Sequence, residues 1–124
     1  MTRAMVVDDS RATRMILSKM LADRGFDVLQ AVNGKDALER MERDGRSLQL
    51  VLVDWNMPEL SGFDFIQAVR ARPEFAQVRL LMITTETETE QMVRALQAGA
   101  DEYLMKPFTV DAVQEKLRIL GVVE

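Results

Sequence analysis

The sequence predicts a single α/β domain in which helices cover both faces of a parallel sheet. Five short apolar runs alternate with stretches whose apolar residues recur about every 3.6 positions, as they do along one side of a helix. The short runs are apolar on both faces, which is typical of parallel strands joined by right-handed crossovers. We therefore expect a doubly wound fold with five strands and five helices.

Each strand is expected from a run of aliphatic or aromatic residues that ends at polar or turn-forming ones. In chain order these runs are RAMVVD (3–8), FDVLQA (26–31), LQLVLVD (48–54), VRLLMIT (78–84) and EYLMK (102–106).

Each helix is expected where apolar residues share one helical face after a strand. In chain order these residues are Ile16, Leu17, Met20 and Leu21, then Ala37, Leu38 and Met41, then Phe65, Ile66 and Val69, then Met92, Val93 and Leu96, and last Val113, Leu117 and Leu120.

Residues that commonly begin and end helices support these boundaries. Asn33 and Thr109 stand where N-caps are expected, and Ser61 precedes Asp64 with the spacing of a capping box. The polar segment at 84–90 is expected to be a loop that enters the fourth helix. Glycines fall just beyond the expected last turns, at Gly25, Gly45, Gly99 and Gly121.

Composition excludes several classes of protein. The 124 residues are 48% hydrophobic and 29% charged, as in ordinary globular domains, and no apolar run approaches the ~20 residues of a membrane span. The net charge of −4 and the scattered basic residues argue against nucleic-acid binding. There is no cysteine and no signal-peptide pattern, so the cytoplasm is the expected compartment. From its length we expect a single domain over 1–124 without an output domain, and we expect it to be a monomer.

Polar side chains end four of the five expected strands. The first strand ends in Asp8 and Asp9, the third in Asp54, the fourth in Thr84 and the fifth in Lys106. The carboxyl ends of parallel strands meet at one edge of a sheet, where ligands bind beside the point at which the strand order reverses. These side chains are therefore expected to form one site.

The three carboxylates favour a cation at this site. Two unit charges 4 Å apart repel by about 4 kcal/mol at an effective dielectric constant of 20. Oxygen ligands without any histidine favour Mg²⁺, although the first two acids are also explained as caps of the first helix. With a hydroxyl and a lysine beside it, the site suits a metal-bound phosphoryl group, and Asp54 is the candidate nucleophile.

Four motifs resemble a known family over the whole chain. They are VVDDS, VDWNMPELSGFDF, ITTE and ADEYLMKPF, and in this order they resemble the receiver domain of bacterial two-component response regulators, most closely the single-domain chemotaxis (CheY-like) type. The resemblance implies a flavodoxin-like fold with strand order 2-1-3-4-5. It also implies a signalling switch that receives a phosphoryl group from a sensor histidine kinase or a phosphotransfer protein and controls an unknown protein target.

The resemblance implies roles for the residues around the phosphorylation site. Asp54 matches the phosphoacceptor, and Asp8 and Asp9 match the pair that holds Mg²⁺, one directly and the other largely through water. Asn56 matches the residue whose backbone carbonyl binds the metal. The side chains of Asn56 and Glu86 match those that tune dephosphorylation, and both predict a short-lived phosphorylated state.

The resemblance also implies a switch. Thr84 matches the switch hydroxyl and Tyr103 the aromatic residue that rotates inward. Lys106 matches the phosphate-binding lysine, whose bond to Pro107 is cis in the family. The output surface is expected on the fourth helix, fifth strand and fifth helix. We expect a protein that phosphorylates itself and hydrolyses its own acyl phosphate, rather than an enzyme that turns over an external substrate.

Two features depart from the family pattern. Thr85 follows the switch threonine where a smaller alanine is commoner, so the loop is expected either to move differently or to resist the inward path of Tyr103. The alternative is that residues 85–90 form a solvated loop with several possible threonine caps. Glu88 and Thr89 stand where motor-binding relatives tend to carry lysines, which argues against a flagellar partner.

Other interpretations of the sequence were weighed. The main alternative is a receiver-like module that docks to its partner without phosphorylation. A haloacid-dehalogenase-type phosphatase needs a second acid where Asn56 stands, and the acids at the first strand end would repel the phosphate of a flavodoxin cofactor. Trp55 is expected to be a partly packed residue at the rim of the site. Arg11 and Arg14 are expected to be solvated or to meet an acidic kinase surface.

Overall fold

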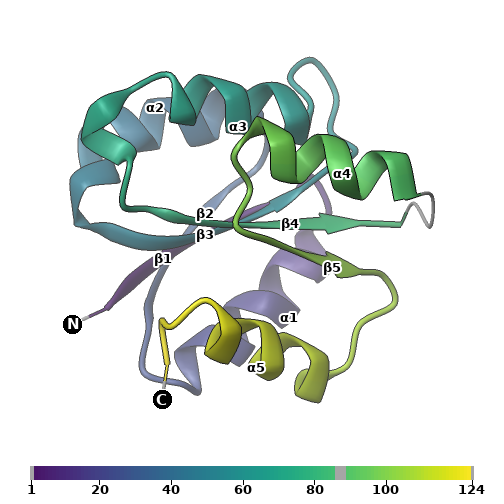
Figure 1. The fold of residues 1–124 in the computed structure, drawn as a ribbon. Coiled ribbons are helices and arrows are strands. Elements are labelled where there is room, and N and C mark those ends of the chain that lie inside the picture. Colours follow the sequence, from purple (N-terminus) through teal and green to yellow (C-terminus); the bar gives the residue numbers. More distant parts are fainter. Residues whose placement is uncertain (1, 86–88, 124) are drawn as a thin grey trace.

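The computed structural model describes residues 2–85 and 89–123 and contains a five-stranded parallel sheet in the order β2-β1-β3-β4-β5 (Figure 1). The predicted fold class and strand order are confirmed. The strands are β1 (Arg3–Val7), β2 (Asp27–Ala31), β3 (Leu48–Asp54), β4 (Arg79–Thr84) and β5 (Glu102–Met105).

Helices follow each strand, as predicted. The five α-helices are α1 (Arg11–Ala22), α2 (Gly34–Asp44), α3 (Gly62–Arg70), α4 (Thr89–Ala98) and α5 (Val110–Ile119), and two short 3₁₀ helices, η1 (Gly45–Ser47) and η2 (Pro73–Phe75), precede β3 and β4.

The strands are one residue shorter than predicted at four ends, namely the starts of β2 and β4 and the ends of β1 and β5. At the two carboxyl ends a polar residue leaves the strand while its backbone N–H continues the ladder. Beyond the end of β1, the Asp8 N–H still donates to the Ala31 oxygen at 3.2 Å. Beyond the end of β5, the Lys106 N–H donates to the Thr84 oxygen at 2.8 Å. The side chains at these ends are therefore placed by the sheet itself.

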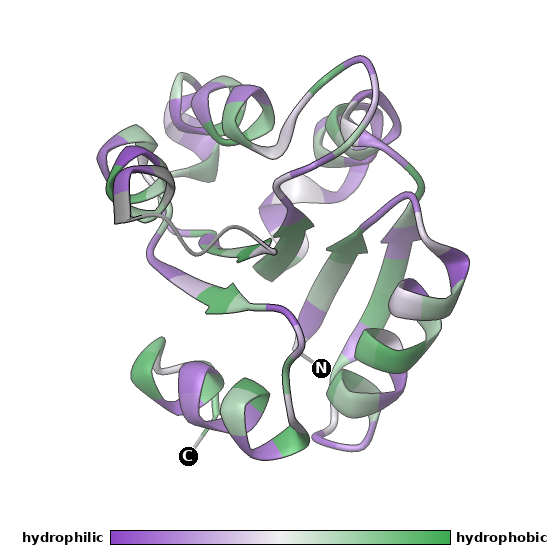
Figure 2. Ribbon diagram, turned by 90° about the vertical axis from the view of Figure 1, so that its right-hand side faces the viewer, coloured by the Kyte–Doolittle hydropathy of each residue, from purple (hydrophilic) through white to green (hydrophobic). Residues whose placement is uncertain are grey.

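Helices α2, α3 and α4 cover one face of the sheet, and α1 and α5 cover the other (Figure 1). Alternation along β3 supplies both cores: Val51 and Val53 pack under α2 to α4, while Leu50 and Leu52 pack against α1 and α5. Figure 2 shows this arrangement as apolar strands between helices whose outer faces are largely polar. Within the described residues, no helix has the length and hydropathy of a membrane span.

Side-chain oxygens cap four of the helices at their N-termini. Asn33, Ser61 and Thr109 each accept a hydrogen bond from the backbone N–H three residues later, as predicted. Ser10 caps α1 in the same way, by accepting from the Thr13 N–H at 3.3 Å. The alternative in which the acids after β1 serve as the cap of α1 is therefore wrong.

The glycines at the helix ends differ from one another. Gly25, Gly99 and Gly121 have positive φ, as expected for residues that end helices. Gly45 instead has φ −57° and continues into η1. A glycine is needed here for a steric reason and not for its φ angle, because a Cβ atom would collide with the ring of Phe75.

Arg70 joins the end of α3 to the segments that precede β4 and β5. Its guanidinium donates to the backbone oxygens of Phe75 at 3.0 Å, Val78 at 2.7 Å and Gly99 at 2.9 Å. It also pairs with Asp101 Oδ2 at 2.8 Å, an oxygen that accepts the Leu80 N–H as well. One side chain therefore provides donors to three backbone oxygens of the irregular segments before β4 and β5.

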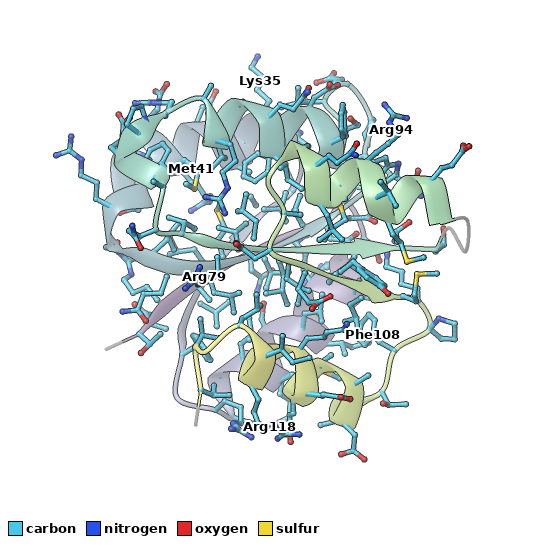
Figure 3. All side chains as sticks on the ribbon, in the orientation of Figure 1. Lys35, Met41, Arg79, Arg94, Phe108 and Arg118 are labelled. Carbon is cyan, nitrogen blue, oxygen red and sulfur yellow. The ribbon has the colours of Figure 1, made fainter. Side chains whose placement is uncertain are left out.

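The first prediction concerns this arginine. Arg70→Met should lower the free energy of unfolding by about 3 kcal/mol, because three backbone acceptors and a carboxylate lose a charged donor. Urea denaturation at neutral pH measures the change. Arg118, which lies on the outer surface of α5 (Figure 3), provides the control: Arg118→Met should change stability by less than about 0.5 kcal/mol. Equal effects of the two substitutions would contradict the role given to Arg70.

Candidate functional site

Three buried polar side chains lie at or just beyond the carboxyl ends of β1, β3 and β4. Asp8 is 1% exposed, Asp54 5% and Thr84 2%. Because these strands are neighbours in the sheet, the three residues reach the same edge, which is the edge that the sequence predicted.

The carboxylates of Asp8, Asp9 and Asp54 form one cluster. Each offers an oxygen that lies within 4.8 Å of the others. Asp8 Oδ1 accepts the Ser10 N–H at 2.8 Å, and Asp54 Oδ1 accepts the Asn56 N–H at 3.4 Å. The first and third strands thus bring together the acids that the sequence places 45 positions apart, between 9 and 54.

Lys106 provides a positive charge next to this cluster. Its Nζ lies 3.4 Å from Asp8 Oδ2 and 3.6 Å from Asp54 Oδ1. The lysine follows β5, and its peptide bond to Pro107 is cis. Three carboxylates therefore face one ammonium group, and the site keeps an excess of negative charge.

The surroundings of Asp54 raise the pKa of its carboxyl group above the ordinary value. Burial is the main cause, and the negative charge of Asp8 adds to it. The ammonium of Lys106 and the N–H of Asn56 act in the opposite direction without cancelling the effect. The protein thus holds at the centre of this site a carboxylate whose negative charge is unfavourable.

The donor set fits a divalent, oxygen-preferring cation such as Mg²⁺. The clustered donors are carboxylate oxygens, the chain contains no histidine or cysteine, and the excess negative charge would be relieved by a doubly positive ion.

Comparisons with known proteins agree with this interpretation. The family model for the response regulator receiver domain matches residues 4–118. The chain belongs to the response regulator receiver family. It is a domain of two-component signalling, and the resemblance seen in its motifs is confirmed.

Several relatives of this receiver domain are chemotaxis proteins. The chain is 38% identical to chemotaxis protein CheY1 of Helicobacter pylori, with 95% of each sequence covered. It is 36% identical to a CheY homologue of Campylobacter jejuni, covering 96% of this chain and 92% of that one. The structure of CheY4 of Vibrio cholerae superposes with a TM-score of 0.89 at 32% identity and covers 97% of this chain and 98% of the other.

The receiver domain places the two predicted switch residues on adjacent strands. Thr84 ends β4, and Tyr103 pairs with Met82 from the neighbouring β5. Tyr103 is partly buried against the core under α2 to α4, and Lys116 Nζ lies 4.6 Å from the centre of its ring. Lys116 also bonds to Glu102 Oε1 at 3.0 Å, so this lysine covers the tyrosine on the outer surface.

Trp55 is more deeply buried than the sequence suggested. It is 8% exposed, because its ring packs 5.7 Å from that of Phe63 at the start of α3. The guanidinium carbon of Arg94, on α4, lies 4.6 Å from the centre of the Phe63 ring. Arg94 is on the side of the sheet that α3 and α4 cover (Figure 3). The residue that follows Asp54 is thereby connected to α4 through a tilted aromatic contact and a cation–π contact.

Gly62 was not singled out in the sequence, yet it supports the site. Its N–H donates to the Trp55 oxygen at 3.0 Å. A Cβ atom there would collide with the Asp54 backbone oxygen and lie 2.9 Å from the Cα of Trp55. The first turn of α3 can therefore rest directly on the backbone that carries Asp54.

The remaining predicted residues lie at the rim of the site or outside the described residues. Glu86 and Glu88 are outside the described residues, and Thr89 begins α4. Thr85 is exposed and lines an apolar groove beside Lys106. Asn56 is exposed at the start of the loop after β3.

The second prediction follows from the raised pKa of Asp54. Between the ordinary value of 3.8 and the raised one, the folded state binds a proton that the unfolded state has lost, so stability falls as pH rises through this interval. Asp54→Asn removes the ionisable carboxyl group and with it this loss of folding stability. Without metal, the variant should exceed wild type in free energy of unfolding by about 1 kcal/mol at neutral pH.

The comparison is made by urea denaturation in EDTA at neutral pH and near pH 4. The advantage of Asp54→Asn should shrink at the acid pH, because Asp54 of the folded wild type is then more fully protonated and less negative charge is buried. Asp9→Asn is the matched control, because this exposed carboxylate should give a smaller change. A variant less stable than wild type at neutral pH would contradict the cost assigned to the buried charge.

Proposed function

We propose that this receiver domain is a phosphorylation-activated switch whose Asp54 accepts a phosphoryl group from a phosphohistidine on a sensor histidine kinase or a phosphotransfer protein. One observation carries the proposal: a buried carboxylate at the end of β3 lies among two further carboxylates and 3.6 Å from Lys106 Nζ. This arrangement combines a nucleophile with groups that balance the charge of a phosphoryl group.

In the proposed reaction an oxygen of Asp54 attacks phosphorus while the bond from phosphorus to the histidine nitrogen breaks. The nitrogen keeps the electron pair of that bond, and Asp54 becomes an acyl phosphate. Asp8, Asp9, Asp54 and the backbone carbonyl of Asn56 would hold Mg²⁺. When bound, the ion would neutralise the clustered oxygens and those of the phosphoryl group.

Lys106 supplies the second positive charge in this proposal. It already lies near the carboxylates of Asp8 and Asp54 and offsets part of their negative charge. We infer that it turns to a phosphoryl oxygen after transfer, since the added phosphoryl group brings new negative charge and a charge-assisted hydrogen bond can form there.

The phosphoryl donor would approach along the groove next to Lys106. Ile16, Met20, Pro107 and Phe108 line this groove, and Ile16 is 51% exposed. An apolar surface beside the phosphoacceptor suits contact with the protein that carries the phosphohistidine.

The switch in this proposal consists of Thr84 and Tyr103. The Thr84 hydroxyl would donate to a phosphoryl oxygen, and Tyr103 would turn inward as the end of β4 moves. Shifting a two-state balance from 1:99 to 99:1 requires about 5.5 kcal/mol. Hydrogen bonds to charged groups contribute roughly 1.5 to 3 kcal/mol each, so Thr84 and Lys106 together could provide much of it.

The signal would end when water hydrolyses the acyl phosphate, and we propose that Asn56 and Glu86 set this rate. The output surface would be α4, β5 and α5, where Val93 and Leu96 are 41% and 42% exposed. The chemotaxis proteins among the relatives support a motility-related pathway. We propose that the domain acts in the cytoplasm as a monomer. Glu88 and Thr89 argue against the partner of the motor-binding relatives.

The third prediction tests phosphoryl transfer. Incubation with acetyl phosphate and Mg²⁺ should add the mass of one phosphoryl group to the wild-type protein, and addition of EDTA should abolish this adduct. Intact-protein mass spectrometry measures both. Asp54→Asn should remain unlabelled, since an amide is not a nucleophile under these conditions.

The control and the alternative use the same assay. Asp64 on α3 is an exposed carboxylate away from the cluster, so Asp64→Asn should be labelled as wild type is. An unmodified wild type, together with a partner that binds equally well to Asp54→Asn, would instead support docking without phosphorylation.

The fourth prediction tests the switch through the only tyrosine in the chain. Protein that incorporates 3-fluorotyrosine has a single ¹⁹F resonance, from Tyr103. Addition of Mg²⁺ with beryllofluoride should shift this resonance in wild type, because the ring moves away from Lys116 and into the core. Thr84→Val keeps the shape of the side chain but removes the hydroxyl, and should lose most of the shift.

Thr13→Val controls for the loss of a threonine hydroxyl elsewhere and should keep the full shift. A resonance that moves equally in wild type and Thr84→Val would show that the Thr84 hydroxyl does not drive the motion of Tyr103.

A further inference from the structure

Arg14 contacts the backbone of the acidic pair. Its Nη1 donates to the backbone oxygen of Asp8 at 2.7 Å, and its Nε donates to Gln30 Oε1 on β2 at 3.3 Å. The sequence grouped Arg14 with Arg11 as solvated or partner-binding residues. The structure separates the two, because Arg11 is exposed while Arg14 joins α1 to the end of β1 and to β2.

The other polar atoms of Asp8 are held by different groups. Its N–H donates to the Ala31 oxygen at 3.2 Å, Oδ1 accepts the Ser10 N–H at 2.8 Å, and Oδ2 lies 3.4 Å from Lys106 Nζ. The backbone oxygen is the remaining hydrogen-bonding group of this buried residue, and Arg14 occupies it.

The bond to this oxygen also constrains Asp9. The Asp8 carbonyl and the Asp9 N–H belong to one planar peptide unit. When Arg14 fixes the direction of the carbonyl, it fixes the plane of that unit and thus the direction in which the Asp9 side chain leaves the backbone. Asp9 is exposed, so little packing holds it otherwise.

We propose that Arg14 is a positioning residue for a divalent cation: by holding the peptide between Asp8 and Asp9, it keeps both carboxylates directed at a common Mg²⁺. The inference rests on the proposed function in one respect, namely that the acidic cluster binds Mg²⁺. Residues that orient metal ligands typically contribute 10- to 100-fold to metal affinity.

Charge and positioning predict opposite results for this residue. A positive charge near the acidic cluster repels Mg²⁺, so its removal alone would strengthen binding. If Arg14 acts by positioning, its removal weakens binding in spite of the lost charge. The direction of the change therefore separates the two roles.

The experiment is a Mg²⁺ titration of the full chain without any phosphoryl donor. Binding is followed by the fluorescence of Trp55, which directly follows Asp54, and by isothermal titration calorimetry. Arg14→Met retains an unbranched apolar stem of similar volume and should bind Mg²⁺ about 10-fold more weakly than wild type. Arg11→Met loses the same charge from the same helix and should bind as tightly as wild type or slightly more tightly.

Two further variants make the result specific. Arg14→Lys keeps the charge and one donor, and should recover part of the lost affinity. Gln30→Leu leaves Arg14 in place but removes the acceptor of its Nε, so it should weaken Mg²⁺ binding in the same direction by a smaller factor. Gln30 is exposed, so this variant retains the fold even if Arg14→Met unfolds.

Arg14→Met and Gln30→Leu proteins that are folded and bind Mg²⁺ as wild type does, or more tightly, would overturn the positioning role. If wild type shows no saturable response to Mg²⁺, the proposed function fails as well. If wild type binds Mg²⁺ and only the variants fail to differ, the proposed function stands and this inference alone is wrong.

Discussion

The buried carboxylates of Asp8 and Asp54 impose the main constraint on this structure. One oxygen of each carboxylate lies within 4.8 Å of the other. Two negative charges 4 Å apart repel by about 4 kcal/mol at an effective dielectric constant of 20. The sheet holds them together because their strands are neighbours with a fixed register, and Lys106 offsets part of the repulsion. The stability of two apolar cores thus maintains an arrangement that the polar groups would not adopt by themselves.

Two arginines stabilise the irregular segments on either side of the sheet by bonding to backbone oxygens. Arg70 holds the segments that lead into β4 and β5, and Arg14 holds the segment that leaves β1. A planar guanidinium with several donors suits this role better than a single-point ammonium does. Loops without a neighbouring strand are in this way held in one conformation. A site built from several converging side chains needs such fixed positions.

The sequence predicts most of the fold, since the strand and helix periods, three N-caps and the strand-end polar residues depend on local patterns. It also identifies which acids meet, because residues at the ends of parallel strands share an edge. It does not identify the partners of Arg14 and Arg70, because most of these partners are backbone oxygens, and the side-chain partners Gln30 and Asp101 lie far away in the sequence. The burial of Trp55 against Phe63 and the steric need for Gly62 depend on how α3 approaches β3, a tertiary contact without a local pattern.

The contact between Gly62 and the Asp54 backbone limits how this domain can diverge. Since any side chain at position 62 would push against the peptide that carries Asp54, a substitution there would have to be accompanied by a shift of the whole of α3. The outward-facing residues of α3, such as Asp64 and Gln67, are free of that restriction. Libraries built to redirect partner choice can therefore vary the outer side of this helix freely, provided that its first residue is left unchanged.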